Sequence, residues 1–193
     1  GAILSAPASN PAADRTLTLP GDADGTILTS NSSTGKILQV KSVTKTNAQS
    51  TSSTNTFVDI TGLSIAITPK QNDSHMFLQA KVNYGGPNNS YAAFRFLRDS
   101  TAIGLSTYGT GNHVNSSFGA KVGNFSNADY DLFNAGGDFL DDRPNGTSQI
   151  TYKLQFSFSA GTSPLYINRP KQTQDSSYIV GGTSTLTVME VAA

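Results

Sequence analysis

Two histidines are the strongest general-base candidates in this sequence of 193 residues, which contains no cysteine and no tryptophan. A nucleophilic triad needs such a base beside a serine or a cysteine. His75 opens a run of alternating residues, His113 lies among glycines and asparagines, and neither belongs to a G-x-S-x-G nucleophile elbow. The lack of cysteine excludes a disulfide scaffold and a thiolate metal site. We therefore interpret both histidines as surface residues and predict no triad.

The carboxylates form three groups, which are Asp22 with Asp24, Asp129 with Asp131, and Asp138 with Asp141 and Asp142. Paired carboxylates hydrolyse glycosides when they are held at the right separation, so Asp131 or Asp141 would serve in a glycan depolymerase. These aspartates lie in turn sequences, however, where the side chain commonly caps the local backbone. In FLDDRP (139–144) we expect Asp141 or Asp142 to pair with Arg143 at the end of a strand.

Motifs for metal or phosphate binding are incomplete. The run DADG (22–25) resembles the opening of a calcium loop, but it lacks the third ligand spacing and the closing glutamate. A phosphate loop follows a strand and opens a helix. The glycine-rich runs YGTGN and AGGD lack this context, so they are not phosphate loops. We therefore predict no catalytic residue, no metal and no cofactor.

Several tyrosines border loops that are rich in glycine, asparagine and aspartate. A tyrosine beside such residues suits contact with a sugar, because its ring stacks on the sugar while the polar groups bind hydroxyls. The alternative is that these rings lie at strand ends and pack on the rim of the fold. The predicted receptor-binding residues are Tyr84, Tyr91, Tyr108, His113 and Tyr130.

The charge composition excludes several classes of partner. The chain has 13 lysines and arginines against 13 aspartates and glutamates, and charged residues make up 13% of it, about half of the usual 25%. Phosphate binding needs a surplus of basic residues, so we expect no nucleic acid partner. No apolar run approaches the ~20 residues of a membrane span, so we expect no membrane insertion. The abundance of Ser, Thr, Asn and Gly is typical of a β-rich extracellular or virion surface.

From about residue 36 onward, apolar residues recur with a period of two. The clearest segments are LSIAIT (63–68), HMFLQAKVNY (75–84) and QITYKLQFSF (149–158). Strict alternation places one set of side chains in a core and the other set in a wetter environment. The expected core residues are Leu63, Ile65, Ile67, Met76, Leu78, Ala80, Val82, Tyr84, Ile150, Tyr152, Leu154, Phe156 and Phe158. Further strand candidates are KILQVKSVTK, TFVDI, SYAAFRFLR, TAIGLSTY, SPLYIN and STLTVMEV.

No segment has sustained helical spacing, and short strands with frequent turn signals indicate an antiparallel sandwich or barrel. Eight or more strands in a domain of this size favour a jelly roll. We predict an all-β fold, an antiparallel jelly-roll-like β-sandwich of residues 36–193, preceded by an extended linker or shaft of residues 1–35. Residues 104–138 have scattered apolar side chains and are interpreted as long loops with one or two short strands.

Five segments carry a family resemblance, namely GKILQVKSVTKT, STNTFVDITGLSIAITPK, FRFLRDSTAIG, FLDDRPNGTSQITYKLQFSF and YINRPKQTQDSSYIVGGTSTLTVMEV. In this order they resemble a C-terminal domain of structural and tail-fibre proteins of tailed phages, especially marine ones. The resemblance runs from Gly35 to the end of the chain, and its most specific part is the last strand, which ends in M-E-V. It implies a virion fibre or spike, homotrimeric, with a jelly-roll head and no catalytic residues.

We accordingly expect a non-enzymatic virion protein, located on a tail fibre or the capsid surface, whose head domain attaches to a host-surface receptor, either a glycan or a protein. The expected partners are further copies in a homotrimer and other virion proteins that the N-terminal segment contacts. The alternatives are a capsid-decorating head fibre and a glycan depolymerase.

Overall fold

A computed structural model describes residues 37–193 except 112, 124–127, 144 and 160–163. The predicted linker or shaft, residues 1–35, lies outside the described residues, as does the calcium-like run at 22–25. The described part is all-β, as predicted. Its strands are β1 (Ile37–Lys45), β2 (Gln49–Thr51), β3 (Val58–Ile67), β4 (His75–Gly85), β5 (Tyr91–Arg98), β6 (Thr101–Ile103), β7 (Phe118–Lys121), β8 (Phe133–Asp141), β9 (Ile150–Ser159), β10 (Leu165–Ile167) and β11 (Ser184–Val191), with one 3₁₀ turn, η1 (Ala128–Tyr130).

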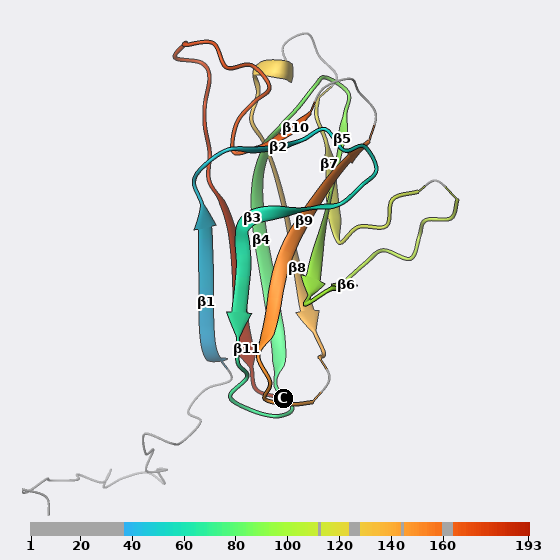
Figure 1. The fold of residues 1–193 in the computed structure, drawn as a ribbon, viewed down its shortest axis with the longest axis vertical. Coiled ribbons are helices and arrows are strands. Elements are labelled where there is room, and N and C mark those ends of the chain that lie inside the picture. The colour runs from blue at the N-terminus through green and yellow to red at the C-terminus, as the bar shows by residue number, and fades with distance from the viewer. Residues whose placement is uncertain (1–36, 112, 124–127, 144, 160–163) are drawn as a thin grey trace, which may run out of the picture. The chain divides into compact units, whose positions relative to one another are not determined.

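The strands form two antiparallel sheets that pack against each other, which confirms the predicted β-sandwich (Figure 1). In the first sheet, which we call sheet A, the order is β1-β11-β4-β10-β2, and β8 pairs with β4. In sheet B the order is β3-β9-β5-β6, and β7 also pairs with β5. The chain passes from one sheet to the other between most of its long strands. The finer assignment to a jelly roll stays a prediction.

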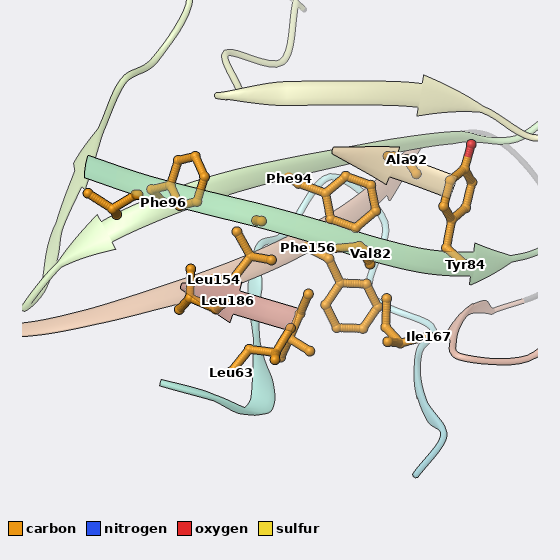
Figure 2. Close-up of a cluster of buried hydrophobic side chains, with 14 of the residues drawn as sticks. Leu63, Val82, Tyr84, Ala92, Phe94, Phe96, Leu154, Phe156, Ile167 and Leu186 are labelled. Atoms are coloured by element: carbon orange, nitrogen blue, oxygen red, sulfur yellow. The ribbon is translucent and has the colours of Figure 1, made fainter. Parts of the chain in front are cut away.

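The core lies between the sheets and follows the predicted alternation. Leu63, Ile65 and Ile67 of β3 are buried, whereas the residues between them are exposed. Every second residue of β4 and β9 is buried in the same way, although Ile150 at the start of β9 is half-buried. Figure 2 shows side chains from both sheets meeting in this cluster. Burying a large apolar side chain contributes about 1.5–3 kcal/mol, so these rows supply the main driving force for folding.

One departure from strict alternation lies in β3. Ile60 and Leu63 are three residues apart, yet both are buried. The pairing of β3 with β9 shifts between Asp59 and Ser64, and Gly62 has a φ of +90° there. Between these two pairs β3 advances five residues while β9 advances two, so this bulge inserts three extra residues in β3. An odd number of extra residues lets both apolar side chains reach the core while Asp59 faces outward.

Residues 104–138 contain two strands among loops, as interpreted, but β8 is longer than the short strands that were expected. It continues through Gly136 and Gly137 to pair with β4 along its whole length. A Cβ atom at position 137 would lie 2.5 Å from the Phe118 ring. Gly137 thus makes room for an aromatic side chain of β7. This glycine is part of a strand and does not mark a loop.

The strand expected over TAIGLSTY is shorter than predicted. It ends at Ile103, because Gly104 has a φ of +61° and turns the chain away from the sheet. A Cβ atom at this position would lie 2.8 Å from the ring of Phe139. Gly104 therefore begins a long loop, residues 104–117, between β6 and β7.

The expected pairing of Asp141 or Asp142 with Arg143 within FLDDRP is also corrected. Asp142 Oδ1 lies 3.1 Å from His75 Nδ1, and Asp141 is bound elsewhere. The Asp141 carboxylate accepts hydrogen bonds from Arg98 Nη1 and from the Tyr152 hydroxyl, each at 2.7 Å. Arg143 donates instead to the carbonyls of Gln71 and Gly146, at 2.8 Å each, and to a serine hydroxyl before β4. The turn is thus tied to strands distant in sequence, which sequence proximity could not indicate.

Glu190, near the end of β11, is a buried carboxylate. It accepts hydrogen bonds from the backbone N–H groups of Lys70 and Gln71, from Ser74 Oγ and from Gln39 Nε2. Burial by itself would raise the pKa of Glu190, but these hydrogen bonds outweigh it and lower the pKa below its ordinary value. The carboxylate therefore anchors the loop before β4.

Asn168 has the same role at the opposite end of β11. Its Nδ2 donates to the carbonyls of Lys45 and Asn47, at 2.9 and 3.1 Å, and its Oδ1 accepts from Ser184 Oγ at 2.6 Å. The residue is buried and has a φ of +66°. An asparagine suits this position because it tolerates the left-handed region and offers both donors and an acceptor.

Candidate functional site

A polar row crosses the outer face of sheet B. Asp59 of β3, Gln155 of β9 and Arg95 of β5 are successive cross-strand neighbours. Arg95 Nε donates to Gln155 Oε1 at 2.8 Å, and Gln155 Nε2 donates to Asp59 Oδ1 at 2.6 Å. Lys153 Nζ lies 3.1 Å from the second carboxylate oxygen of Asp59. Because neighbouring residues on these strands point into the core, this row faces solvent.

The guanidinium of Arg95 stacks on an aromatic ring. Its central carbon lies 4.0 Å from the centroid of the Phe57 ring, just before β3. Burial lowers the pKa of Arg95, and the negative charge of Asp59 partly offsets this. The pKa of Asp59 is itself lowered, chiefly by the hydrogen bond from Gln155, while burial opposes the shift. Both groups are charged at neutral pH, and the guanidinium plane is fixed by ring and amide together.

The loop of residues 104–117 rises beside this row, and Figure 1 shows it reaching away from the sheets between β6 and β7. Its base is fixed by Ser117, whose hydroxyl donates to the Ile103 carbonyl and accepts from the Phe96 N–H. Near its tip the rings of Tyr108 and His113 lie 5.6 Å apart. A loop held by a rigid sheet is a common place for binding residues.

An open hollow of about 690 Å³ lies between the loop and the polar row. It is lined by Asn55, Phe57, Arg95, Gly111, His113, Val114 and Asn115. An aromatic ring, amides and a guanidinium therefore meet at one concave surface. Such a mixture of an apolar platform with a few polar groups is typical of ligand sites.

A second hollow of about 420 Å³ adjoins the first, since Val114 lines both. Tyr91 and Lys121 lie in its wall together with the serines Ser116, Ser157 and Ser159. The Lys121 Nζ lies 5.2 Å from the centroid of the Tyr91 ring. The two hollows form one candidate site along β5, with a ring beside a cation in each.

Three of the five predicted receptor-binding residues lie at this site. Tyr91 lines the second hollow, His113 lines the first, and Tyr108, which is 85% exposed, contacts His113 at the loop tip. Tyr130 lies in η1, where its ring contacts Tyr178 at 5.9 Å, and it lines neither hollow.

Tyr84 was predicted to be exposed like the other tyrosines, and this prediction is wrong. The side chain is buried in the core cluster of Figure 2, and its hydroxyl donates to the Lys121 carbonyl at 3.3 Å. Burial raises the pKa of Tyr84 to about 12. The alternation in β4 had placed this residue on the core face, and that prediction is confirmed.

Sequence reasoning did not single out Phe57, Arg95, Gln155 and Lys121. The period of two does place Arg95 and Gln155 on the outer face of their strands, which is the signal that could have found them. Their neighbourhood depends on strand pairing between segments 60 residues apart. Pattern within one strand carries no information on that pairing.

Asp131 and Asp141, the aspartates weighed for a depolymerase, do not line these hollows. Asp141 is held by Arg98 and Tyr152, as described above, and Asp129 binds Lys171 Nζ at 2.6 Å. In the part of the chain that the structure describes, no three histidine, aspartate or glutamate side chains are grouped as a metal site requires. Within the same ranges no helix is long and apolar enough to cross a bilayer.

In comparisons with known proteins, no family model and no curated protein matches the chain. The resemblance to tailed-phage structural proteins therefore stays a prediction, and the geometry of the site is the basis for the function proposed below.

Proposed function

We propose that this protein is a non-enzymatic virion fibre or spike protein whose β-sandwich head attaches to a glycan on the host surface. The observation that carries the proposal is the pair of adjoining hollows beside the 104–117 loop, where rings, amides and cations are exposed together. Sugars are bound by rings that stack on their apolar faces and by amides and charged groups that bind their hydroxyls. The open form of both hollows suits a chain ligand better than an enclosed small molecule.

Binding to polysaccharide extracted from host cells tests this proposal directly. The purified protein should be retained on immobilised host polysaccharide. The Tyr108→Ala variant should be retained more weakly, because it lacks a highly exposed ring at the loop tip. Tyr178→Ala is a matched control, since Tyr178 is also exposed but its ring contacts Tyr130, whereas the Tyr108 ring contacts His113 in the wall of the first hollow. Retention that is absent, or equal for parent and Tyr108→Ala, would refute attachment through this face.

We further propose a homotrimer, supported by an apolar row on the outer face of sheet A. Val40, Met189, Phe77 and Leu140 are successive cross-strand neighbours on β1, β11, β4 and β8. Val40 is 55% exposed and Leu140 is 52% exposed. An uncharged row on an otherwise polar sheet face suits contact with another copy of the chain.

Light scattering tests the trimer at micromolar concentration. The parent should have three times the chain mass of 20.2 kDa, and Leu140→Asp should be a monomer with an unchanged far-UV circular dichroism spectrum. Val180→Asp is the control, because Val180 is equally exposed but lies outside the row. A monomeric parent would refute the trimer, and a trimeric Leu140→Asp would refute this row as its interface.

The two alternatives predict different observations. Immunogold labelling of the particle on the capsid rather than the tail would identify a head fibre. Release of reducing ends from host polysaccharide, abolished by Asp141→Asn or Asp131→Asn in a folded protein, would identify a depolymerase.

A further inference from the structure

We propose that the two hollows on sheet B bind an acidic glycan, one that carries carboxylate or sulfate groups. This inference rests on the proposed attachment function and names its ligand class. The ionisable side chains that line the hollows are Arg95 and His113 in the first, and Lys121 with Tyr91 in the second. Among the residues that the structure describes, no aspartate or glutamate lines either hollow. In a chain with equal numbers of acidic and basic residues, this is a local concentration of positive charge.

The guanidinium of Arg95, the first of the two cations, is held in an orientation that suits an anion. Arg95 uses its Nε to bind Gln155 and stacks on Phe57, so its plane is held. Within the described residues, neither terminal nitrogen of Arg95 has a hydrogen-bond partner. A planar guanidinium with two free nitrogens matches a carboxylate or sulfate, which it can bind through two parallel hydrogen bonds.

The acid in the same row does not cancel this charge. Asp59 is separated from Arg95 by Gln155, and its carboxylate is bound by Gln155 and paired with Lys153. It does not line the hollow. Gln155 therefore holds Arg95 through its Nε, and the two terminal nitrogens of the guanidinium stay available to a ligand.

The second cation, Lys121, is also uncommitted. Of the lysines in the described ranges, Lys121 and Lys81 are the two whose ammonium groups have no hydrogen bond or ion pair. Lys121 lies in the wall of a hollow beside the ring of Tyr91, whereas Lys81 lies on the outer face of sheet A. Lys81 is thus a matched control for the role of Lys121.

The test compares three polymers as probes, which are alginate (carboxylate), dextran sulfate (sulfate) and neutral dextran. The parent should bind one or both of the acidic polymers and bind neutral dextran at least tenfold more weakly. Raising the salt concentration should weaken acidic binding, because exposed charges are screened. Preference between alginate and dextran sulfate identifies which anion the site takes.

Variants then assign the binding to this site. Arg95→Gln and Lys121→Gln should each weaken acidic binding by about tenfold, the expected effect of one lost charge-assisted hydrogen bond. Arg95→Lys should retain part of the binding, because it keeps the charge and loses the fork. Lys81→Gln should bind as the parent does. Within the described residues the Lys121 ammonium makes no hydrogen bond or ion pair and only faces the Tyr91 ring, so its variant remains informative even if Arg95→Gln is destabilised.

The outcomes separate this inference from the proposed function. If the parent is retained on host polysaccharide in a Tyr108-dependent way but shows no preference for acidic polymers, the acidic ligand is refuted and attachment stands. If Lys81→Gln weakens binding as much as Lys121→Gln does, the binding is non-specific attraction of a polyanion, and the inference is again refuted. If host polysaccharide is not bound at all, both proposals fail.

Discussion

Replacing Asp141 with alanine should cost this domain a large part of its stability. The carboxylate is 4% exposed and holds two partners, Arg98 and the buried Tyr152, at 2.7 Å each. Burial, followed by the hydrogen bond to Asp141, raises the pKa of Tyr152, so its hydroxyl is protonated and donates. Without the carboxylate, a buried hydroxyl and a partly buried guanidinium both lose their acceptor.

The magnitude follows from these burials. Breaking a buried pair by removal of one partner costs about 3–5 kcal/mol. The Arg98 side chain keeps 23% of its exposure and can regain water, so we expect the lower end, about 3 kcal/mol. Tyr152→Phe removes its hydroxyl together with the bond and should cost less, about 1–2 kcal/mol. Domains of this kind are stable by about 5–15 kcal/mol, and the Asp141→Ala melting temperature should fall by about 6–12 °C.

Urea unfolding followed by far-UV circular dichroism and tyrosine fluorescence measures these differences, since the chain has no tryptophan. Asp138→Ala is the matched control, because Asp138 lies on the same strand but is exposed. Equal stability of Asp141→Ala and Asp138→Ala would refute the structural role. If Asp141→Asn also kept its stability and lost release of reducing ends, Asp141 would be a catalytic acid and the non-enzymatic proposal would be wrong.

Three further predictions concern the anchors and turns of the fold. The pKa of Glu190 lies below its ordinary 4.5, so its stabilisation is present above that pH and is lost as the pH falls through the folded-state pKa; Glu190→Gln should therefore flatten the acid side of a stability profile measured by urea unfolding. Asn168→Ala should cost about 2–4 kcal/mol, because the buried Lys45 carbonyl and the partly buried Asn47 carbonyl lose a donor and the buried Ser184 hydroxyl loses its acceptor, and a loss under about 1 kcal/mol in the same assay would contradict this. Gly104→Ala should lower the melting temperature more than Gly111→Ala does, because both glycines have positive φ but a Cβ at Gly104 alone meets a ring; equal effects in thermal melts would show that crowding is not the cause.

The part of the fold that depends on single strands could be predicted from the sequence. Alternation in β3, β4 and β9 identified the core faces, because the side-chain period of a strand is a local property. Tyr84 shows the strength of this rule: its place in the β4 alternation indicated burial, whereas the loop composition after it indicated exposure, and the alternation was right. Where the two local signals disagree, the strand alternation decides the position of the side chain, because burial of apolar surface contributes more free energy than the composition of a neighbouring loop.

The parts that were missed depend on contacts between distant segments. The glycine pair in β8 indicates a loop until the Phe118 ring that covers Gly137 is known. The bulge at Gly62 decides that Asp59 faces outward, beside Gln155. The candidate site has the same origin, since Arg95 and Gln155 become neighbours through the register of β5 with β9. Register is set by packing of whole sheets, so no pattern within one strand contains it.

A sandwich of two sheets leaves one outer face on each sheet, and in this protein the two faces differ in chemistry. Sheet B carries the polar row and the hollows with Arg95 and Lys121, and sheet A carries the apolar row that ends at Leu140. Because the core separates them, a contact between copies through sheet A would leave the hollows of each copy open. Weak binding at each hollow would then be multiplied by the number of copies, since linked sites gain avidity without new contacts. Open hollows suit weak binding of one ligand at a time, and several copies together can bind a polymer whose units repeat along a surface. The proposed attachment function and the proposed oligomer therefore support each other.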